Sequence, residues 1–138
     1  MMPKKLFVLA VSPDGDNCIQ ELKGVLKKQQ IDIYSAESCE EVARLLDQTH
    51  PELIFTAKLL RDGTWRNVIH LSESLSVPTN VIVVGDYQDI SLYLSAMDYG
   101  AFDFILPPFE NDAVAHVVRV ASESVRRRRE SQATIAVA

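Results

Sequence analysis

Apolar residues along the chain follow two spacings, one typical of buried strands and one typical of amphipathic helices. Five short runs are either almost continuously apolar or alternate apolar with polar positions, as strands of a parallel sheet do. These runs are Leu6–Val11, Ile31–Tyr34, Glu52–Ala57, Asn80–Val84 and Phe104–Leu106. The second run alternates and predicts an edge strand, whereas the first, third and fourth predict strands buried on both faces.

Between these runs the apolar residues recur at helical spacing. Four stripes are clear: Ile19, Leu22 and Leu26; Val42, Leu45, Leu46 and Thr49; Ile90, Tyr93, Leu94 and Met97; and Val114, Val117, Val118, Ala121 and Val125. A weaker helical pattern covers Thr64–Leu75. Helix starts are indicated by Ser38 with Glu41 and by Asn111–Asp112, and Gly100 is placed to end the fourth helix. The last helix is predicted to end near Arg129.

Five alternations of strand and helix predict an α/β fold, a (βα)5 doubly wound parallel five-stranded sheet in the order 2-1-3-4-5, of flavodoxin-like type. We assign residues 4–127 to this domain and 128–138 to a helix end with a linker or tail. Ligands of such sheets bind at the carboxyl ends of the central strands. The loops to examine are therefore Ser12–Asp16, Ala57–Gly63, Gly85–Asp89 and Leu106–Phe109.

Composition supports one globular domain without a metal or disulfide framework. The chain has 138 residues, of which 47% are hydrophobic and 24% charged, and its apolar runs fall far short of the ~20 residues that span a bilayer. Cys18 and Cys39 form no metal-binding spacing, and the amino terminus is not a secretory signal, so we expect a reduced, cytoplasmic protein.

The net charge of −5 hides an uneven distribution. Outside residues 126–138 the chain has 10 basic and 18 acidic residues, a balance of −8. Such a body repels phosphates, so we expect no direct nucleic-acid binding and no membrane binding. The run Arg126–Arg129 is interpreted as solvated cations that favour the negative end of the last helix.

Two stretches carry a resemblance to a known family. Tyr99–Phe109 is similar to the "GAFDYLPKPF" wording of receivers in front of nitrogen-regulation-type activators, and Pro51–Ile54 followed by Asp62–Gly63 looks like the family's "PDLILLD…DG" stretch. Over roughly Lys4 to Arg127 the chain resembles the receiver domain of bacterial two-component response regulators. The resemblance implies a phosphorelay role and a cis peptide between Pro107 and Pro108.

The resemblance also shows where this chain departs from the family. Receivers transfer a phosphoryl group from a histidine kinase to an aspartate, assisted by Mg²⁺, a lysine and a hydroxyl. Here the acceptor position falls on Ala57, the hydroxyl position on Gly85 and the lysine position on Pro107, and at most Asp14 survives of the acidic pair. An alanine methyl is no nucleophile, and one carboxylate is a weak Mg²⁺ anchor. We therefore expect a pseudo-receiver with no catalytic residue, no cofactor, and lost or weak Mg²⁺ binding.

The interpretation favoured by the sequence is a regulatory, non-enzymatic interaction module that acts without phosphorylation. Its partner would be another protein or an effector domain, and a homodimer would use the family's face of the fourth helix, fifth strand and fifth helix. That face is expected to include Tyr93, Asp98, Phe104, Glu110, Asp112 and Arg119.

Two other readings stay open. The domain could be a phosphorylatable receiver with a displaced acceptor, for which Asp62 and Asp86 are the candidates. It could also bind a nucleotide or another small ligand in the crevice, although no strand is followed by GxGxxG or GxxxxGK[ST]. His50, His70 and His116 show no metal-ligand spacing, and Trp65 is expected to be a packing residue.

Overall fold

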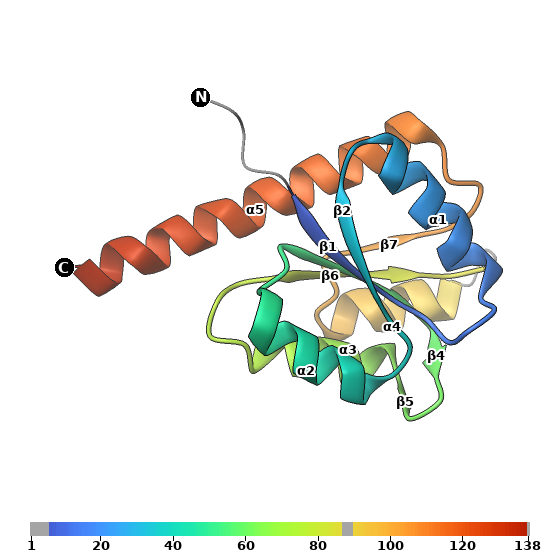
Figure 1. Cartoon of the computed structure of the whole chain (residues 1–138), viewed down its shortest axis with the longest axis horizontal. Helices are drawn as coiled ribbons and strands as arrows, with labels where there is room; N and C mark the ends of the chain where they lie inside the picture. Colours follow the sequence, from blue (N-terminus) through green and yellow to red (C-terminus); the bar gives the residue numbers. More distant parts are fainter. Residues whose placement is uncertain (1–5, 87–89, 138) are drawn as a thin grey trace.

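A five-stranded parallel sheet forms the centre of the molecule (Figure 1). This computed structural model describes residues 6–86 and 90–137, so residues 4–5 of the expected domain and 87–89 of the expected site loops lie outside the described residues. The strands are β1 (Phe7–Val11), β2 (Asp32–Ala36), β3 (Leu53–Ala57), β6 (Asn80–Val84) and β7 (Asp103–Ile105). Their order, β2-β1-β3-β6-β7, is the predicted order 2-1-3-4-5, since β4 and β5 belong to a separate hairpin.

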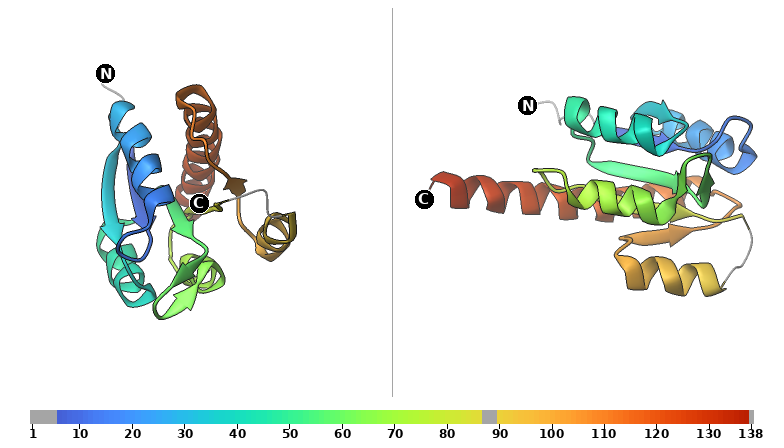
Figure 2. Two further views of the ribbon diagram at one scale, coloured as in Figure 1. Left: turned by 90° about the vertical axis from the view of Figure 1, so that its right-hand side faces the viewer. Right: turned by 90° about the horizontal axis from the view of Figure 1, so that it is seen from below.

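Helices cover both faces of this sheet (Figures 1 and 2). One face carries α1 (Asn17–Lys28) and α5 (Asn111–Val137), and the other carries α2 (Cys39–Thr49), α3 (Trp65–Glu73) and α4 (Ile90–Tyr99). Burial on two faces explains why the central strands are almost continuously apolar. The predicted flavodoxin-like α/β architecture is confirmed.

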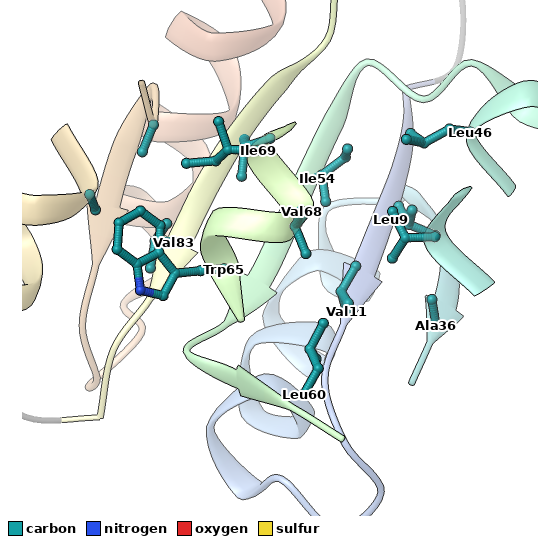
Figure 3. Packing of buried hydrophobic residues seen from close by; sticks show 14 of the residues in the cluster. Leu9, Val11, Ala36, Leu46, Ile54, Leu60, Trp65, Val68, Ile69 and Val83 are labelled. Carbon is teal, nitrogen blue, oxygen red and sulfur yellow. The ribbon is translucent and has the colours of Figure 1, made fainter. Parts of the chain in front are cut away.

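Successive side chains of the central strands enter two separate cores. Leu53 and Phe55 of β3 pack towards α1 and α5, whereas Ile54 packs towards α2 and α3. Figure 3 shows the second core, in which Trp65 and Val68 of α3 lie over the sheet. Trp65 is thus a packing residue, as predicted.

Several local signals have their predicted effect. The Ser38 hydroxyl accepts a hydrogen bond from the Glu41 amide at 3.2 Å and so caps α2. Gly100 ends α4 with a φ of +123°, a conformation that glycine adopts without strain. The peptide between Pro107 and Pro108 is cis, as the resemblance implied.

A short hairpin after β3 was not predicted. Strand β4 (Leu59–Leu60) pairs antiparallel with β5 (Gly63–Thr64) and leads directly into α3. Each strand has only two residues, which is too short for a periodic signal. The hairpin lies at the carboxyl end of β3, where the sequence analysis had placed a loop.

The apolar stripe of α4 faces outwards rather than into the core. Ile90, Tyr93, Leu94 and Met97 are 68%, 43%, 58% and 37% exposed, while Leu92 and Ala96 are buried against the sheet. The helix was correctly predicted from this stripe, but the usual inference that such a stripe is buried is wrong here. The small residue Ala96 lets α4 approach the sheet on its less apolar side.

The last helix is longer than predicted. α5 continues to Val137, so the expected end near Arg129 is wrong, and most of the segment 128–138 is helical (Figure 2). The arginine run is not wholly solvated either, because Arg129 is 22% exposed and bonded to the body of the domain. Within the described part of the chain, no helix is both long and apolar enough to cross a bilayer.

Candidate functional site

The carboxyl ends of the central strands border a crevice with a volume of about 680 Å³. This is the edge where ligands of doubly wound sheets bind. Residues from the start of α1, the end of β3, the end of β6 and the segment after β7 line it: Asp16, Asn17, Cys18, Ile19, Glu21, Ala57, Lys58, Leu59, Val84, Gly85, Asp86 and Pro107.

The three positions singled out by the resemblance meet in this crevice. Ala57 is the last residue of β3 and pairs with Val84 of β6, and Gly85 follows directly. Pro107 lies after β7 on the neighbouring strand. The structure therefore brings Ala57, Gly85 and Pro107 together, although none of them carries a nucleophile, a hydroxyl or an amine.

The predicted acidic remnant lies elsewhere. Asp14 is exposed on the turn after β1 and does not line the crevice; Asp16 does. The Asp16 carboxylate accepts a hydrogen bond from the Ile19 amide at 3.0 Å and caps α1. One of its oxygens is thus engaged in helix capping.

The carboxylates of the crevice act electrostatically on the thiol of Cys18. Burial raises the pKa of Cys18, and the negative charges of Asp16, Asp86 and Glu21 raise it further. Among residues 6–86 and 90–137, no three His, Cys, Asp or Glu side chains are grouped closely enough to hold a metal ion. Phosphorylatable receivers bind Mg²⁺ through clustered oxygen ligands, and lost or weak Mg²⁺ binding stays a prediction for this chain.

The space beside Gly85 is already filled. A Cβ added to this glycine would lie 2.7 Å from Phe104 Cζ and 2.9 Å from Leu106 Cδ2, closer than side-chain atoms pack. The Phe104 ring also meets Tyr93 of α4 edge to face, with ring centroids 5.8 Å apart. A serine or threonine cannot occupy position 85 without displacing this aromatic contact.

Asp62 has a structural role. Its carboxylate accepts hydrogen bonds from the Cys39 and Glu40 amides, at 2.8 and 3.1 Å, and so holds the β4–β5 hairpin against the start of α2. The bond from the Cys39 amide is the main reason why the pKa of Asp62 lies below its usual value. Burial and the neighbouring Asp62 raise the pKa of the Cys39 thiol to about 11, which makes it a poor nucleophile.

The residues predicted for an interaction face lie on adjacent surface elements. Tyr93 and Asp98 are exposed on α4, Phe104 is half-buried in β7, and Arg119 is exposed on α5. Glu110 is exposed just before α5, and Asp112 is exposed in its first turn. Sequence reasoning did not find that Ile90, Leu94 and Met97 add an apolar surface to this face, because an exposed stripe and a buried stripe have the same spacing.

The three histidines lie apart from the crevice. His50 caps α2, while His70 on α3 and His116 on α5 are exposed, and none of them lines the crevice. His116 instead lies 3.0 Å from an Arg119 guanidinium nitrogen on the same helix.

Comparison with known proteins shows which proteins this chain is similar to. No family model matches the sequence. The response regulator protein PilR of Pseudomonas aeruginosa is 25% identical over 122 residues, which cover 88% of this chain and 26% of PilR. The chain thus spans about a quarter of the length of this curated relative.

Solved structures agree on the fold. NtrX from Brucella abortus matches with a TM-score of 0.79 at 21% identity, covering 95% of this chain and 29% of NtrX. The signal receiver domain of a LuxO-type repressor protein from Vibrio parahaemolyticus matches with a TM-score of 0.75 at 22% identity, covering 89% of this chain and 94% of that domain.

Sheet order and these structural neighbours show the fold of response-regulator receiver domains, and the similarity to PilR agrees with the resemblance found in the sequence. The sequence of residues 99–109 had predicted this similarity to receiver domains. Ala57, Gly85 and Pro107, the three positions that the resemblance singles out, all line the crevice.

The contact between Gly85 and Phe104 gives a first prediction. Gly85→Ala should destabilise the domain by about 1–3 kcal/mol, because the added methyl overpacks the site. The matched control is Gly24→Ala in α1, where an added Cβ meets nothing within 4 Å, and which should be neutral or stabilising. Urea denaturation measures both.

The same experiment includes a double variant. Phe104→Leu should recover part of the stability that Gly85→Ala loses, because the two side chains share one space. If Gly85→Ala were as stable as the native chain, the Phe104 ring would be able to move aside at no cost, and the prediction would be wrong.

Proposed function

We propose that this receiver domain acts as a regulatory module that binds a protein and does not accept a phosphoryl group. The observation that carries the proposal is the meeting of Ala57, Gly85 and Pro107 in one crevice, where the transfer reaction needs a nucleophile, a hydroxyl and a cation. Losing one charge-stabilising donor costs about 10²–10³ in rate, and losing the nucleophile removes the covalent route.

The filled space at Gly85 supports the same conclusion. In this chain Phe104 occupies the volume beside Gly85 and at the same time contacts Tyr93 on α4. The crevice and the interaction face are thus joined by packing, and no phosphoryl group is required to hold that contact.

The outward stripe of α4 supports a role in binding. Ile90, Tyr93, Leu94 and Met97 are all exposed and recur at helical spacing along α4, and grouped exposed apolar residues mark protein interaction sites. Asp98 on α4, with Asp112 and Arg119 on α5, supplies exposed charges that would orient a partner. A second copy of the chain is the first partner to test, and an effector domain is the alternative.

The geometry gives less support to the two alternative functions, a receiver with a displaced acceptor and a binder of small ligands. Asp62 is engaged with the amides of α2, which leaves Asp86 as the displaced acceptor that lines the crevice. A nucleotide would fit by volume, but Asp16, Glu21 and Asp86 would repel its phosphates. We therefore rank both below an interaction module.

Phosphorylation is tested directly by intact-mass analysis after incubation with acetyl phosphate and Mg²⁺. The native chain should gain no phosphoryl group, and Ala57→Asp alone should stay largely unmodified because the metal ligands and the lysine are still missing. Adding Pro107→Lys and Pro13→Asp to Ala57→Asp should recover partial modification. A phosphoryl group on the native chain that disappears in Asp86→Asn would instead establish a displaced acceptor.

Binding through α4 is tested by sedimentation velocity over a range of concentrations. Leu94→Gln should weaken self-association about tenfold in Kd, because about 1–2 kcal/mol of apolar contact is lost. Leu59→Gln is the matched control, since Leu59 is 60% exposed, close to the 58% of Leu94, but lies on the β4–β5 hairpin. Both variants should retain native stability, as exposed substitutions do.

Charge at the rim of this face should matter less. Arg119→Glu should weaken the dimer by a smaller factor, since exposed ion pairs contribute ~0–1 kcal/mol. Equal effects of Leu94→Gln and Leu59→Gln would contradict the α4 face, and a chain that stays monomeric at millimolar concentration would contradict self-association.

A further inference from the structure

Beyond the core, polar side chains attach α5 to the amino-terminal edge of the sheet, and Arg129 makes most of these contacts. The Arg129 guanidinium donates from Nε to the Pro78 carbonyl at 2.8 Å and from Nη2 to the carbonyls of His50 and Pro51, at 3.1 and 3.0 Å. These carbonyls belong to the segments that lead into β6 and β3. A single side chain therefore joins α5 to two separate loops.

A buried carboxylate completes this contact. Glu52 is 7% exposed in its side chain and lies 4.0 Å from Arg129 Nη1, while its other oxygen accepts a hydrogen bond from the Phe7 amide at 2.8 Å. Glu52 thus links the first residue of β1 to the helix. A buried carboxylate needs such partners, because an unpaired charge inside a protein is costly.

Two neighbouring side chains extend the attachment along the helix. Arg128 donates to the side-chain oxygen of Asn80, whose amide nitrogen donates to the Ala121 carbonyl at 2.9 Å. Gln132 donates to the Ser76 carbonyl at 2.8 Å. The contacts continue the face on which Val118, Ala121 and Val125 pack against the sheet, because all of these positions recur every three or four residues.

We infer that residues 126–133 of α5 form a rigid arm, and that Arg129 is the positioning residue that sets its direction relative to the sheet. Apolar packing holds α5 as far as Val125, and beyond that point the polar contacts of Arg129 take over. Figure 2 shows the helix continuing in one line past the body of the domain.

The chemistry of arginine explains why this side chain suits the task. A guanidinium presents five N–H donors in a planar fork and can bond several carbonyls at once, whereas a lysine amine is a compact point charge. Three carbonyls and one carboxylate converge on Arg129. A lysine there would keep the charge but lose most of the directional contacts.

The arm deepens the proposed interaction role, because Asp112 and Arg119 of the interaction face lie on the same helix. Movement of the loops before β3 and β6 would tilt α5 through Arg129, and tilting α5 would move the loops in turn. The arm measurement below contains no phosphodonor and no partner, so it can fail or succeed independently of the proposed function.

The test uses the whole ¹⁵N-labelled chain and compares the native protein with Arg129→Ala, Arg129→Lys and Arg127→Ala. Arg127 is exposed on the opposite side of the helix and serves as the matched control. Residual dipolar couplings of amides 126–133 report the direction of the arm, and amide hydrogen exchange reports its opening.

In the native chain and in Arg127→Ala, the couplings of amides 126–133 should fit the alignment tensor of the sheet. In Arg129→Ala they should shrink by about half or more, and exchange at these amides should accelerate about tenfold or more. Arg129→Lys should resemble Arg129→Ala, and it keeps the test usable if the alanine variant fails to fold. Native couplings already averaged relative to residues 111–125, or unchanged couplings in both Arg129 variants, would overturn the inference.

Discussion

Burial of the central strands on both faces is the constraint from which the rest of the architecture follows. Every residue of β3 and β6 is buried, so each strand needs a helical layer above and below it. Right-handed crossovers supply those layers and keep the strands parallel. Their carboxyl ends therefore meet at one edge, which creates the crevice, and their amino ends meet at the opposite edge, where Arg129 attaches α5.

At the crevice, Gly85, one of the positions that the resemblance assigns to phosphoryl transfer, takes part in side-chain packing. The absence of a side chain at Gly85 gives the Phe104 ring room, and Phe104 in turn supports Tyr93 on α4. Asp16, which lines the same crevice, caps a helix, and Asp62 holds a hairpin to α2. Asp16 and Asp62 therefore have structural partners, and the outward apolar stripe of α4 is the feature that favours a binding role.

The fold could be predicted from the sequence because its signals are local and strong. A short, almost wholly apolar run such as Asn80–Val84 is typical of a buried strand. The sequence around Gly100 indicates where α4 ends and the following strand begins. The positions of Ala57, Gly85 and Pro107 in one crevice followed from sheet topology, since the carboxyl ends of neighbouring parallel strands are adjacent.

Other features depend on contacts that spacing does not encode. The stripe of Ile90 and Leu94 has the same period whether it faces the core or the solvent, and only the packing of Ala96 decides which. The arginine run looked like a solvated helix end because the carbonyl groups that Arg129 binds carry no signature in the sequence. A steric conflict at Gly85 likewise requires the position of Phe104, which lies on another strand.

The most direct test of phosphorylation independence is a two-dimensional ¹H–¹⁵N spectrum of the native chain, recorded with Mg²⁺ and beryllium fluoride, a mimic of an aspartate-bound phosphoryl group. Amides around the crevice, including those of Ala57, Lys58 and Gly85, report binding there. We predict that these resonances stay at their positions in the salt-matched control, because the crevice offers neither an acceptor carboxylate at position 57 nor a grouped set of metal ligands among the described residues. Saturable shifts at these amides would contradict the account.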